Sequence, residues 1–115
     1  MLACNKEKNS YNVYFYTNKK DEYTHLKLYI NEKEKGDLPY FTTKLNFEND
    51  TLMPRALYLK MAPGNYPIII KDQWGNVKLD GHIKVKRKSL VASSVIGELI
   101  TTTKDHDAIV ELNYN

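Results

Sequence analysis

Three histidines are the side chains of this sequence best suited to metal binding or acid–base catalysis. They stand at positions 25, 82 and 106, and His106 is flanked by Asp105 and Asp107. Zinc sites in proteins usually take three or four protein ligands. The stretch around His106 does not supply them, because neighbouring side chains of an extended segment point in opposite directions. We therefore expect no metal site.

No enzyme motif accompanies these histidines. Ser93 and Ser94 lie in an apolar stretch without the Gly-x-Ser-x-Gly turn that exposes a catalytic serine. Carboxylates such as Glu32, Glu34 and Asp37 belong to a charged segment of the kind found on most protein surfaces. The sequence has neither a Gly-x-Gly-x-x-Gly nor a Walker loop for phosphate. We therefore expect a protein that is not an enzyme and has no cofactor.

The strongest charge pattern is the stretch KVKRK. It contributes Lys84, Lys86, Arg87 and Lys88, and Lys78 precedes it on the same expected strand. These cations are candidate binding residues for anionic lipid headgroups, lipopolysaccharide or an acidic partner. Alternatively, lysines on an edge strand prevent pairing with the strands of other molecules. The sequence leaves both interpretations open.

Aromatic residues offer a second candidate surface. Trp74 lies in DQWGN, a stretch typical of a hairpin tip. Tyr29 and Tyr58 alternate with leucines, which predicts that both point away from the core. Such rings could bind a polysaccharide or a protein partner, since tyrosine and tryptophan give rigid contact area with a polar tip. Alternatively, they cover the flanks of the fold.

Length and composition limit the other possibilities. The chain has 115 residues, the size of one domain, and a single cysteine, which excludes an internal disulfide framework. Its 17 basic and 14 acidic residues give a net charge of +3. Because this excess is small and interleaved, we expect no nucleic-acid partner. No apolar run approaches the ~20 residues of a membrane-spanning helix.

Alternating hydrophobicity predicts an all-β fold. The expected strands are 11–17, 23–31, 40–47, 57–61, 66–72, 76–88 and 108–114. Turn residues separate them at the intervals typical of an antiparallel β-sandwich. We therefore expect residues 11–115 to form one immunoglobulin- or transthyretin-like sandwich of about seven strands. Within it we expect 66–72 to be central, Gly81 to mark a bulge, and 101–107 to form a loop.

The segment 89–100 fits two structures. Its apolar residues follow a helical stripe, and Ser89 could cap the helix. Gly97 and the β-branched residues weigh against a helix. A strand is the favoured interpretation, and one short helix is the alternative.

The first residues carry a hint of cellular location. Leu2-Ala3-Cys4 resembles the end of a bacterial lipobox, in which a small residue precedes the cysteine that receives lipid. Residues 5–10 are polar and aperiodic, as in a flexible tether, so residues 1–10 are expected to lie outside the sandwich. The resemblance implies a protein anchored by lipid on Cys4 in the bacterial envelope. The expected site is the outer membrane, facing the periplasm or the surface. The alternative is a frayed terminus with a chance cysteine.

Two stretches between Leu26 and Val77 resemble known surface modules. LYINEKEKGDLPYF is similar to the strand, Gly-x-x-Pro turn and strand of PEGA domains. LYLKMAPGNYPIIIKDQWGN is similar to the Pro-Gly-x-Tyr hairpin of PEGA, transthyretin-like and carboxypeptidase-regulatory-like domains. The resemblance implies a small, non-catalytic β-sandwich of secreted or envelope proteins.

These observations lead to one expected function and two alternatives. We expect a non-catalytic lipoprotein that serves as a binding or structural component of a cell-envelope or secretion assembly. The first alternative is a carbohydrate-binding module that uses a row of coplanar rings. The second is an inhibitor or immunity-type protein that blocks an enzyme with a loop such as Lys71 to Val77.

Overall fold

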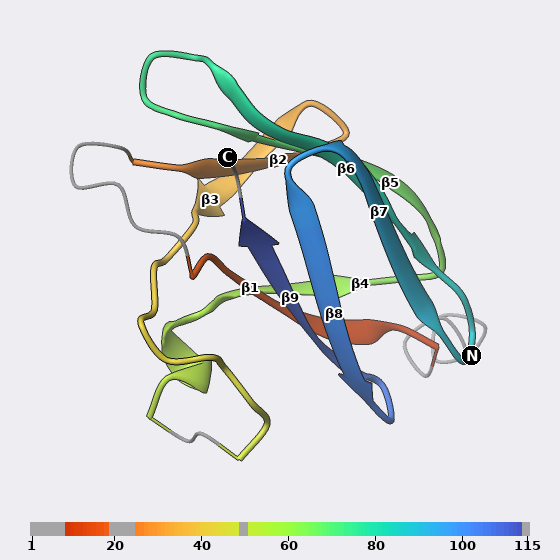
Figure 1. The fold of residues 1–115 in the computed structure, drawn as a ribbon. Helices are drawn as coiled ribbons and strands as arrows, with labels where there is room; N and C mark the ends of the chain where they lie inside the picture. The colour runs from red at the N-terminus through yellow and green to blue at the C-terminus, as the bar shows by residue number, and fades with distance from the viewer. Residues whose placement is uncertain (1–8, 19–24, 49–50, 114–115) are drawn as a thin grey trace.

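A computed structural model describes residues 9–18, 25–48 and 51–113 (Figure 1). Cys4 and most of the expected tether lie outside these residues. In the described part, nine strands form two sheets, and the one helical element is a single 3₁₀ turn at Met53–Arg55. The expectation of an all-β, two-sheet domain is confirmed.

The two sheets have four and five strands. The four-stranded sheet has the order β4-β1-β9-β8, and the five-stranded sheet has the order β3-β2-β5-β6-β7. The strands are β1 (Tyr11–Tyr16), β2 (Lys27–Ile30), β3 (Lys33–Asp37), β4 (Leu57–Met61), β5 (Gly64–Lys71), β6 (Val77–Val85), β7 (Leu90–Ile96), β8 (Glu98–Lys104) and β9 (Asp107–Asn113).

Among the nine described strands, pairing is antiparallel, as expected, with one exception. β1 pairs with β9 in parallel, with Val13 opposite Ala108 and Phe15 opposite Val110. Alternating hydrophobicity cannot reveal this direction, because it reports which face a side chain occupies and not how neighbouring strands run.

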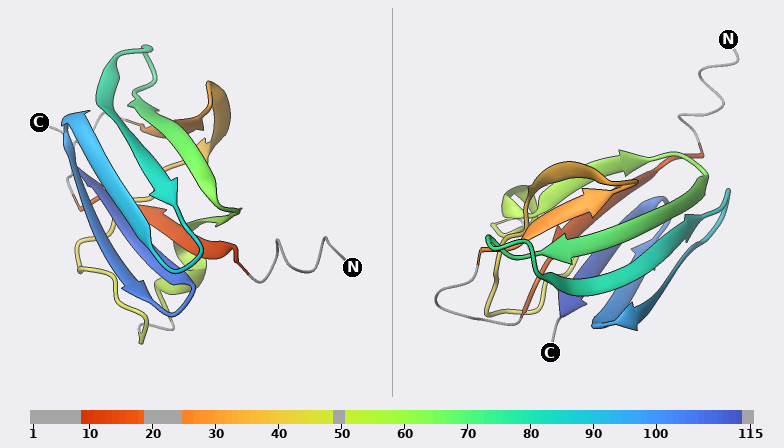
Figure 2. Two further views of the ribbon diagram at one scale, coloured as in Figure 1. Left: turned by 90° about the vertical axis from the view of Figure 1, so that its right-hand side faces the viewer. Right: turned by 90° about the horizontal axis from the view of Figure 1, so that it is seen from above.

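The core lies between the sheets, which the views of Figure 2 show as two layers. Alternate residues of the strands point into it, as their hydrophobic period requires. β1 contributes Val13 and Phe15, and β5 contributes Ile68 and Ile70; all four are at most 1% exposed. β5 is the middle strand of its sheet, as expected.

A second apolar cluster covers the outer side of the four-stranded sheet. Tyr16 and Ile109 face outward from β1 and β9 and pack with Phe41, Leu45 and Ala56. Residues 40–47, expected to form a strand, instead cross this face as a loop whose only backbone bridge joins Tyr40 to Thr17. The strand prediction was wrong because apolar residues of a covering loop can also alternate.

The turns expected in the two stretches that resemble PEGA and related domains were also wrong. β2 and β3 form a hairpin with a turn at Asn31 and Glu32, so Gly36 lies inside β3 and not in a Gly-x-x-Pro turn. β4 and β5, on either side of Pro63, belong to different sheets. Pro63 therefore lies in a link between the two layers and not in a hairpin.

The segment 89–100 forms two strands. β7 ends at Ile96, Gly97 has a φ of 82°, and β8 begins at Glu98. The strand interpretation is confirmed, and the alternative of a short helix is wrong. Residues 101–104 continue β8, so the loop expected at 101–107 is only a turn at Asp105 and His106.

Two residues show how the sheet tolerates its irregular positions. Pro67 lies beyond the end of β2, where its carbonyl oxygen accepts a hydrogen bond from the backbone of Asn31 over 3.1 Å. Its missing N–H faces this same side, so no bond of the β5–β6 ladder is lost.

A bulge occurs next to Gly81, but on the neighbouring strand: Gly81 pairs with Ser94 and Asp80 with Ile96, so the extra residue is Val95 of β7.

Candidate functional site

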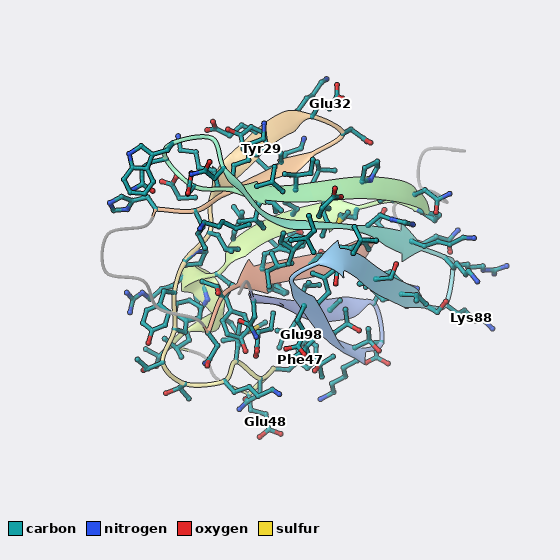
Figure 3. All side chains as sticks on the ribbon, turned by 45° about the horizontal axis from the view of Figure 1, so that its top comes forward. Tyr29, Glu32, Phe47, Glu48, Lys88 and Glu98 are labelled. Atoms are coloured by element: carbon teal, nitrogen blue, oxygen red, sulfur yellow. The ribbon has the colours of Figure 1, made fainter. Side chains whose placement is uncertain are left out.

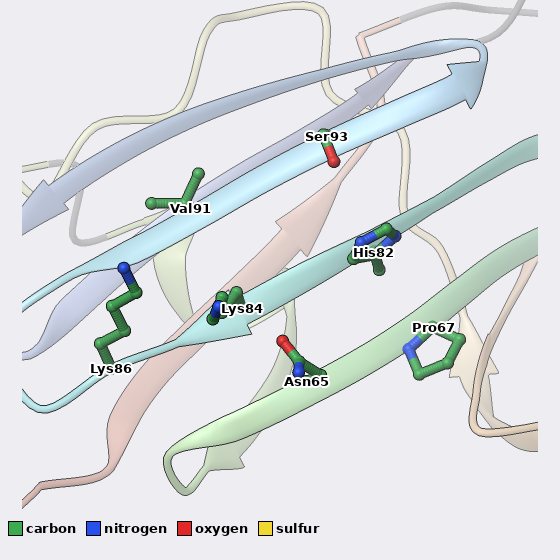
Figure 4. A pocket seen from close by; sticks show the side chains of 7 residues that line it. All are labelled: Asn65, Pro67, His82, Lys84, Lys86, Val91 and Ser93. Atoms are coloured by element: carbon green, nitrogen blue, oxygen red, sulfur yellow. The ribbon is translucent and has the colours of Figure 1, made fainter.

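A shallow groove crosses the outer face of the five-stranded sheet. It has a volume of about 560 Å³ and is lined by Asn65 and Pro67 of β5, His82 and Lys84 of β6, Lys86, and Val91 and Ser93 of β7. Figure 4 shows these side chains on the same side of three neighbouring strands. Strand alternation explains this, since His82 and Lys84 are exposed while Gly81, Ile83 and Val85 face the core.

The groove is basic. Lys84 and Lys86 are exposed, and neither lies within 4.0 Å of a carboxylate among residues 9–18, 25–48 and 51–113. Arg87 and Lys88 continue the positive charge into the β6–β7 turn. Lys78 lies elsewhere: its Nζ is 3.9 Å from Oδ2 of Asp72, near the opposite end of β6. The groove therefore combines uncompensated cations with short or neutral side chains.

The edge-strand interpretation of these cations was wrong. β6 lies between β5 and β7 and is paired on both sides, so Lys84 does not protect an open edge. Lys86, Arg87 and Lys88 lie in the turn after β6 and block no strand either. Lys84 on the sheet face and Lys86 in the adjoining turn both line the groove instead.

Trp74 stands at the opposite end of the β5–β6 hairpin. Its side chain is 68% exposed. The turn below it is held by Asp72, whose Oδ1 accepts hydrogen bonds from the backbone N–H groups of Trp74 and Asn76, each over 2.9 Å. Oδ2 accepts a third bond from Nδ2 of Asn76. A fixed turn thus presents an exposed indole.

These hydrogen bonds also set the acidity of Asp72. Burial raises its pKa, but the bonds from Asn76 and Trp74 and the charge of Lys78 outweigh burial and lower the pKa below 3.8. The carboxylate is therefore charged throughout the neutral range and keeps the turn in place.

The aromatic candidates do not form one platform. Tyr29 points outward from the five-stranded sheet, with Nζ of Lys71 5.0 Å from its ring centre. Tyr58 points outward from the other sheet and packs against Tyr14 at 5.3 Å. Figure 3 shows Tyr29 far from Lys88. The outward direction predicted for both tyrosines is confirmed, but the described residues do not provide the coplanar row that a sugar platform would need.

The three histidines lie apart. His25 binds through its backbone to Gln73, and His82 lines the groove. His106 packs its ring on Tyr11, and its Nε2 lies 3.0 Å from the carbonyl oxygen of Arg87. In the part of the chain that the structure describes, no three His, Cys, Asp or Glu residues gather as metal ligands.

Sequence reasoning found the cations of the groove and missed its other walls. His82, Asn65 and Pro67 join Lys84 because β5 and β6 pair with His82 opposite Pro67 and Lys84 opposite Asn65. On β7, Ser93 stands opposite His82 and Val91 stands opposite Lys84. The DQWGN hairpin was visible in the sequence, but the register of β5 against β6 shifts between Ile70 and Lys71, so the hairpin alone does not fix the groove pairs. The second register runs unbroken from the turn at residues 86–89 to Gly81 and shifts only between Gly81 and Asp80, so that turn sets the groove pairs.

No family model matches this chain, and no curated protein or solved structure matches it either. Among the residues that the structure covers, no helix is long and apolar enough to cross a bilayer.

Proposed function

We propose that this domain is a non-catalytic binding component of a cell-envelope or secretion assembly, and that it holds an anionic partner in the groove between β5, β6 and β7. The observation that carries this proposal is the position of Lys84 and Lys86. Both cations lie beside a concave surface without a carboxylate nearby among the described residues, so a negatively charged group would find them unpaired.

The envelope location is part of the same proposal. It rests on the lipobox-like Leu2-Ala3-Cys4 and on the resemblance of residues 26–77 to PEGA, transthyretin-like and carboxypeptidase-regulatory-like modules. A lipid on Cys4 would anchor the domain at the outer membrane, on its periplasmic or surface side. Residues 5–10 would act as the tether between the lipid and β1.

Binding of defined polyanions tests the function. Dextran sulfate, poly-L-glutamate and phosphatidylglycerol vesicles are titrated against the domain, with backbone amide NMR or light scattering as the readout. We expect at least one probe to bind, to shift the amide signals of β6 and β7, and to weaken as salt rises. Replacing Lys84 and Lys86 by alanine should lower the affinity by about 10-fold.

A matched variant separates the groove from overall charge. Lys44 and Lys104 are also exposed but lie outside the groove, so replacing both by alanine removes the same charge. This control should change the affinity by no more than about 2-fold. Equal losses in the two variants, or no binding of any probe, would refute the proposal.

The fixed turn at Trp74 favours a second candidate, the inhibitor or immunity-type protein. An exposed indole on a preorganised loop loses little entropy when it enters a pocket of an enzyme. A pull-down with the intact domain tests this: loss of a protein partner in the Trp74→Ala variant, with Lys84→Ala without effect, would support this candidate over the basic groove.

A further inference from the structure

The edge of the five-stranded sheet beside the groove is open. β7 pairs with β6 on one side only, and β8, which follows it after Gly97, belongs to the other sheet. Figure 1 shows β7 and β8 diverging from their shared turn. Every second residue of an edge strand points its N–H and C=O groups away from its one neighbour, so β7 offers free backbone groups.

From Leu90 to Ser94, before the bulge at Val95, this edge lacks the usual protection. Charged residues, proline or short length normally keep edge strands from pairing with other chains. Of the four edge strands in the described part of the chain, β3, β4 and β8 each contain charged residues, and β7 (LVASSVI) contains none. Val91 and Val95 are also 55% and 84% exposed. The open edge is therefore uncharged and apolar.

The same edge is one wall of the basic groove. Val91 lies opposite Lys84, and Ser93 lies opposite His82. A strand added to β7 would lie about 10 Å from β6, two strand spacings away. Because Val91 and Ser93 are short, long acidic side chains on the added strand could pass over them to Lys84 and Lys86.

We infer that the partner is an extended acidic segment of a protein, which adds to β7 as the sixth strand of this sheet. Backbone hydrogen bonds to β7 provide the docking, carboxylates of the segment pass over Val91 to pair with Lys84 and Lys86, and its alternate apolar residues lie on the opposite face, beside Leu90 and Ala92. This inference rests on the proposed function, since it assigns a chemical class to the anionic partner. The charge complementarity favours an acidic segment over a second copy of this chain, which would bring its own Lys84 and Lys86 to the seam.

Capped peptides test the inference without any change to the protein. The probe is a peptide of about nine residues, the length of a long strand, that alternates glutamate and valine. Two analogues carry N-methyl groups, one on the glutamates and one on the valines. Only one set of N–H groups in an added strand faces β7, so one analogue should lose binding at least about 10-fold and the other should keep it.

Hydrogen exchange gives a second readout. On addition of the unmodified peptide, the β7 amides that point to the open edge should gain protection, while the amides of edge strand β3 should not change. Replacing the glutamates of the peptide by lysines should abolish binding, as should Lys84→Ala combined with Lys86→Ala.

The outcomes separate this inference from the proposed function. If dextran sulfate binds through Lys84 and Lys86 but the peptide does not, or if both N-methyl analogues bind alike, the groove is an anion site and strand addition is wrong. If the domain self-associates through β7 in sedimentation experiments and excludes the peptide, the occupant is a second copy and the inference is also wrong. If no anionic probe binds, the proposed function fails as well.

Discussion

The hydroxyl group of Tyr16 donates a hydrogen bond of 2.6 Å to Oε1 of Glu111, directly across the parallel strands β1 and β9. Both residues are buried. Asn113 donates to Oε2 of the same carboxylate over 2.6 Å, and the backbone N–H of Leu45 donates to the Tyr16 oxygen over 3.1 Å. This network joins the covering loop to the four-stranded sheet where β1 and β9 pair in parallel.

The network predicts a loss of stability at alkaline pH. Burial, the hydrogen bond to Glu111 and the charge of Glu111 raise the pKa of Tyr16 from 10.0 to about 12, against a weaker lowering by Leu45. Because the folded pKa is the higher one, the stabilisation is complete below pH 10 and is lost as pH rises towards 12. Roughly 2–3 kcal/mol should disappear from the free energy of unfolding, measured by urea denaturation.

Two variants check the origin of this loss. Tyr16→Phe should be less stable near neutral pH by about 1–3 kcal/mol, because Glu111 loses a buried donor. It should also show a flatter dependence on pH between 10 and 12. Tyr58→Phe changes an exposed tyrosine and should keep the alkaline loss of the unmodified protein. An unchanged slope in Tyr16→Phe would contradict the assignment.

Gly81 predicts a large effect from one methyl group. A Cβ atom at this position would lie 2.3 Å from the carbonyl oxygen of Ser93 and 2.9 Å from Cα of Ser94, both backbone atoms of β7. Gly81→Ala should therefore cost about 3 kcal/mol or more, because the β6–β7 bulge must shift. It should also disturb the groove, because Ser93, whose carbonyl oxygen the Cβ atom would meet, is one of its lining residues.

Gly75→Ala is the matched control. Gly75 has a φ of +85° in the Trp74 turn, and a Cβ atom there would meet nothing within 4 Å. Only backbone strain of about 1–2 kcal/mol is expected. Thermal unfolding of both variants makes the comparison, and a Gly81→Ala protein as stable as Gly75→Ala would contradict the close approach.

The sequence predicted the strands whose hydrophobic period meets a buried face. Leu28 and Ile30 of β2 point inward with Tyr29 outward, and Ile109 and Val110 of β9 face the two apolar clusters on opposite sides of their sheet. Local turn chemistry also identified the hairpin around Trp74. In each case the determining interactions lie within a few residues of one another along the chain.

Features that depend on distant partners were not predictable in this way. Phe41 and Leu45 alternate like strand residues, but backbone pairing is absent there except at Tyr40 among the described residues, and the side chains cover a sheet formed by β1 and β9. Pro63 looks like a hairpin residue, yet the strands around it join different sheets. Likewise, the lysines of β6 could be placed on an outer face but not inside the sheet, because strand order is set by contacts far apart in sequence.

Asp72 predicts an acid-sensitive turn. Its lowered pKa means that the stabilisation of the folded turn is complete above pH 3.8 and is lost as pH falls below that value. Asp72→Asn removes the charge and should lower the melting temperature at neutral pH but flatten its fall in acid. Asp105→Asn, at an exposed turn residue, serves as the control and should keep the acid profile of the unmodified protein.

Trp74 predicts a separation of stability from recognition. Its indole is mostly exposed and the turn is held by Asp72, so Trp74→Ala should change the free energy of unfolding by less than about 0.5 kcal/mol. Asp72→Ala keeps the indole but removes three side-chain hydrogen bonds of the turn, leaving the two backbone bonds of Asp72 to Asn76 and Gly75. If the turn recognises a partner, both variants should weaken binding, Trp74→Ala by loss of contact and Asp72→Ala by loss of preorganisation. Indole fluorescence anisotropy should fall in Asp72→Ala as the turn gains freedom, and an unchanged anisotropy would show that Asp72 does not hold Trp74 in place.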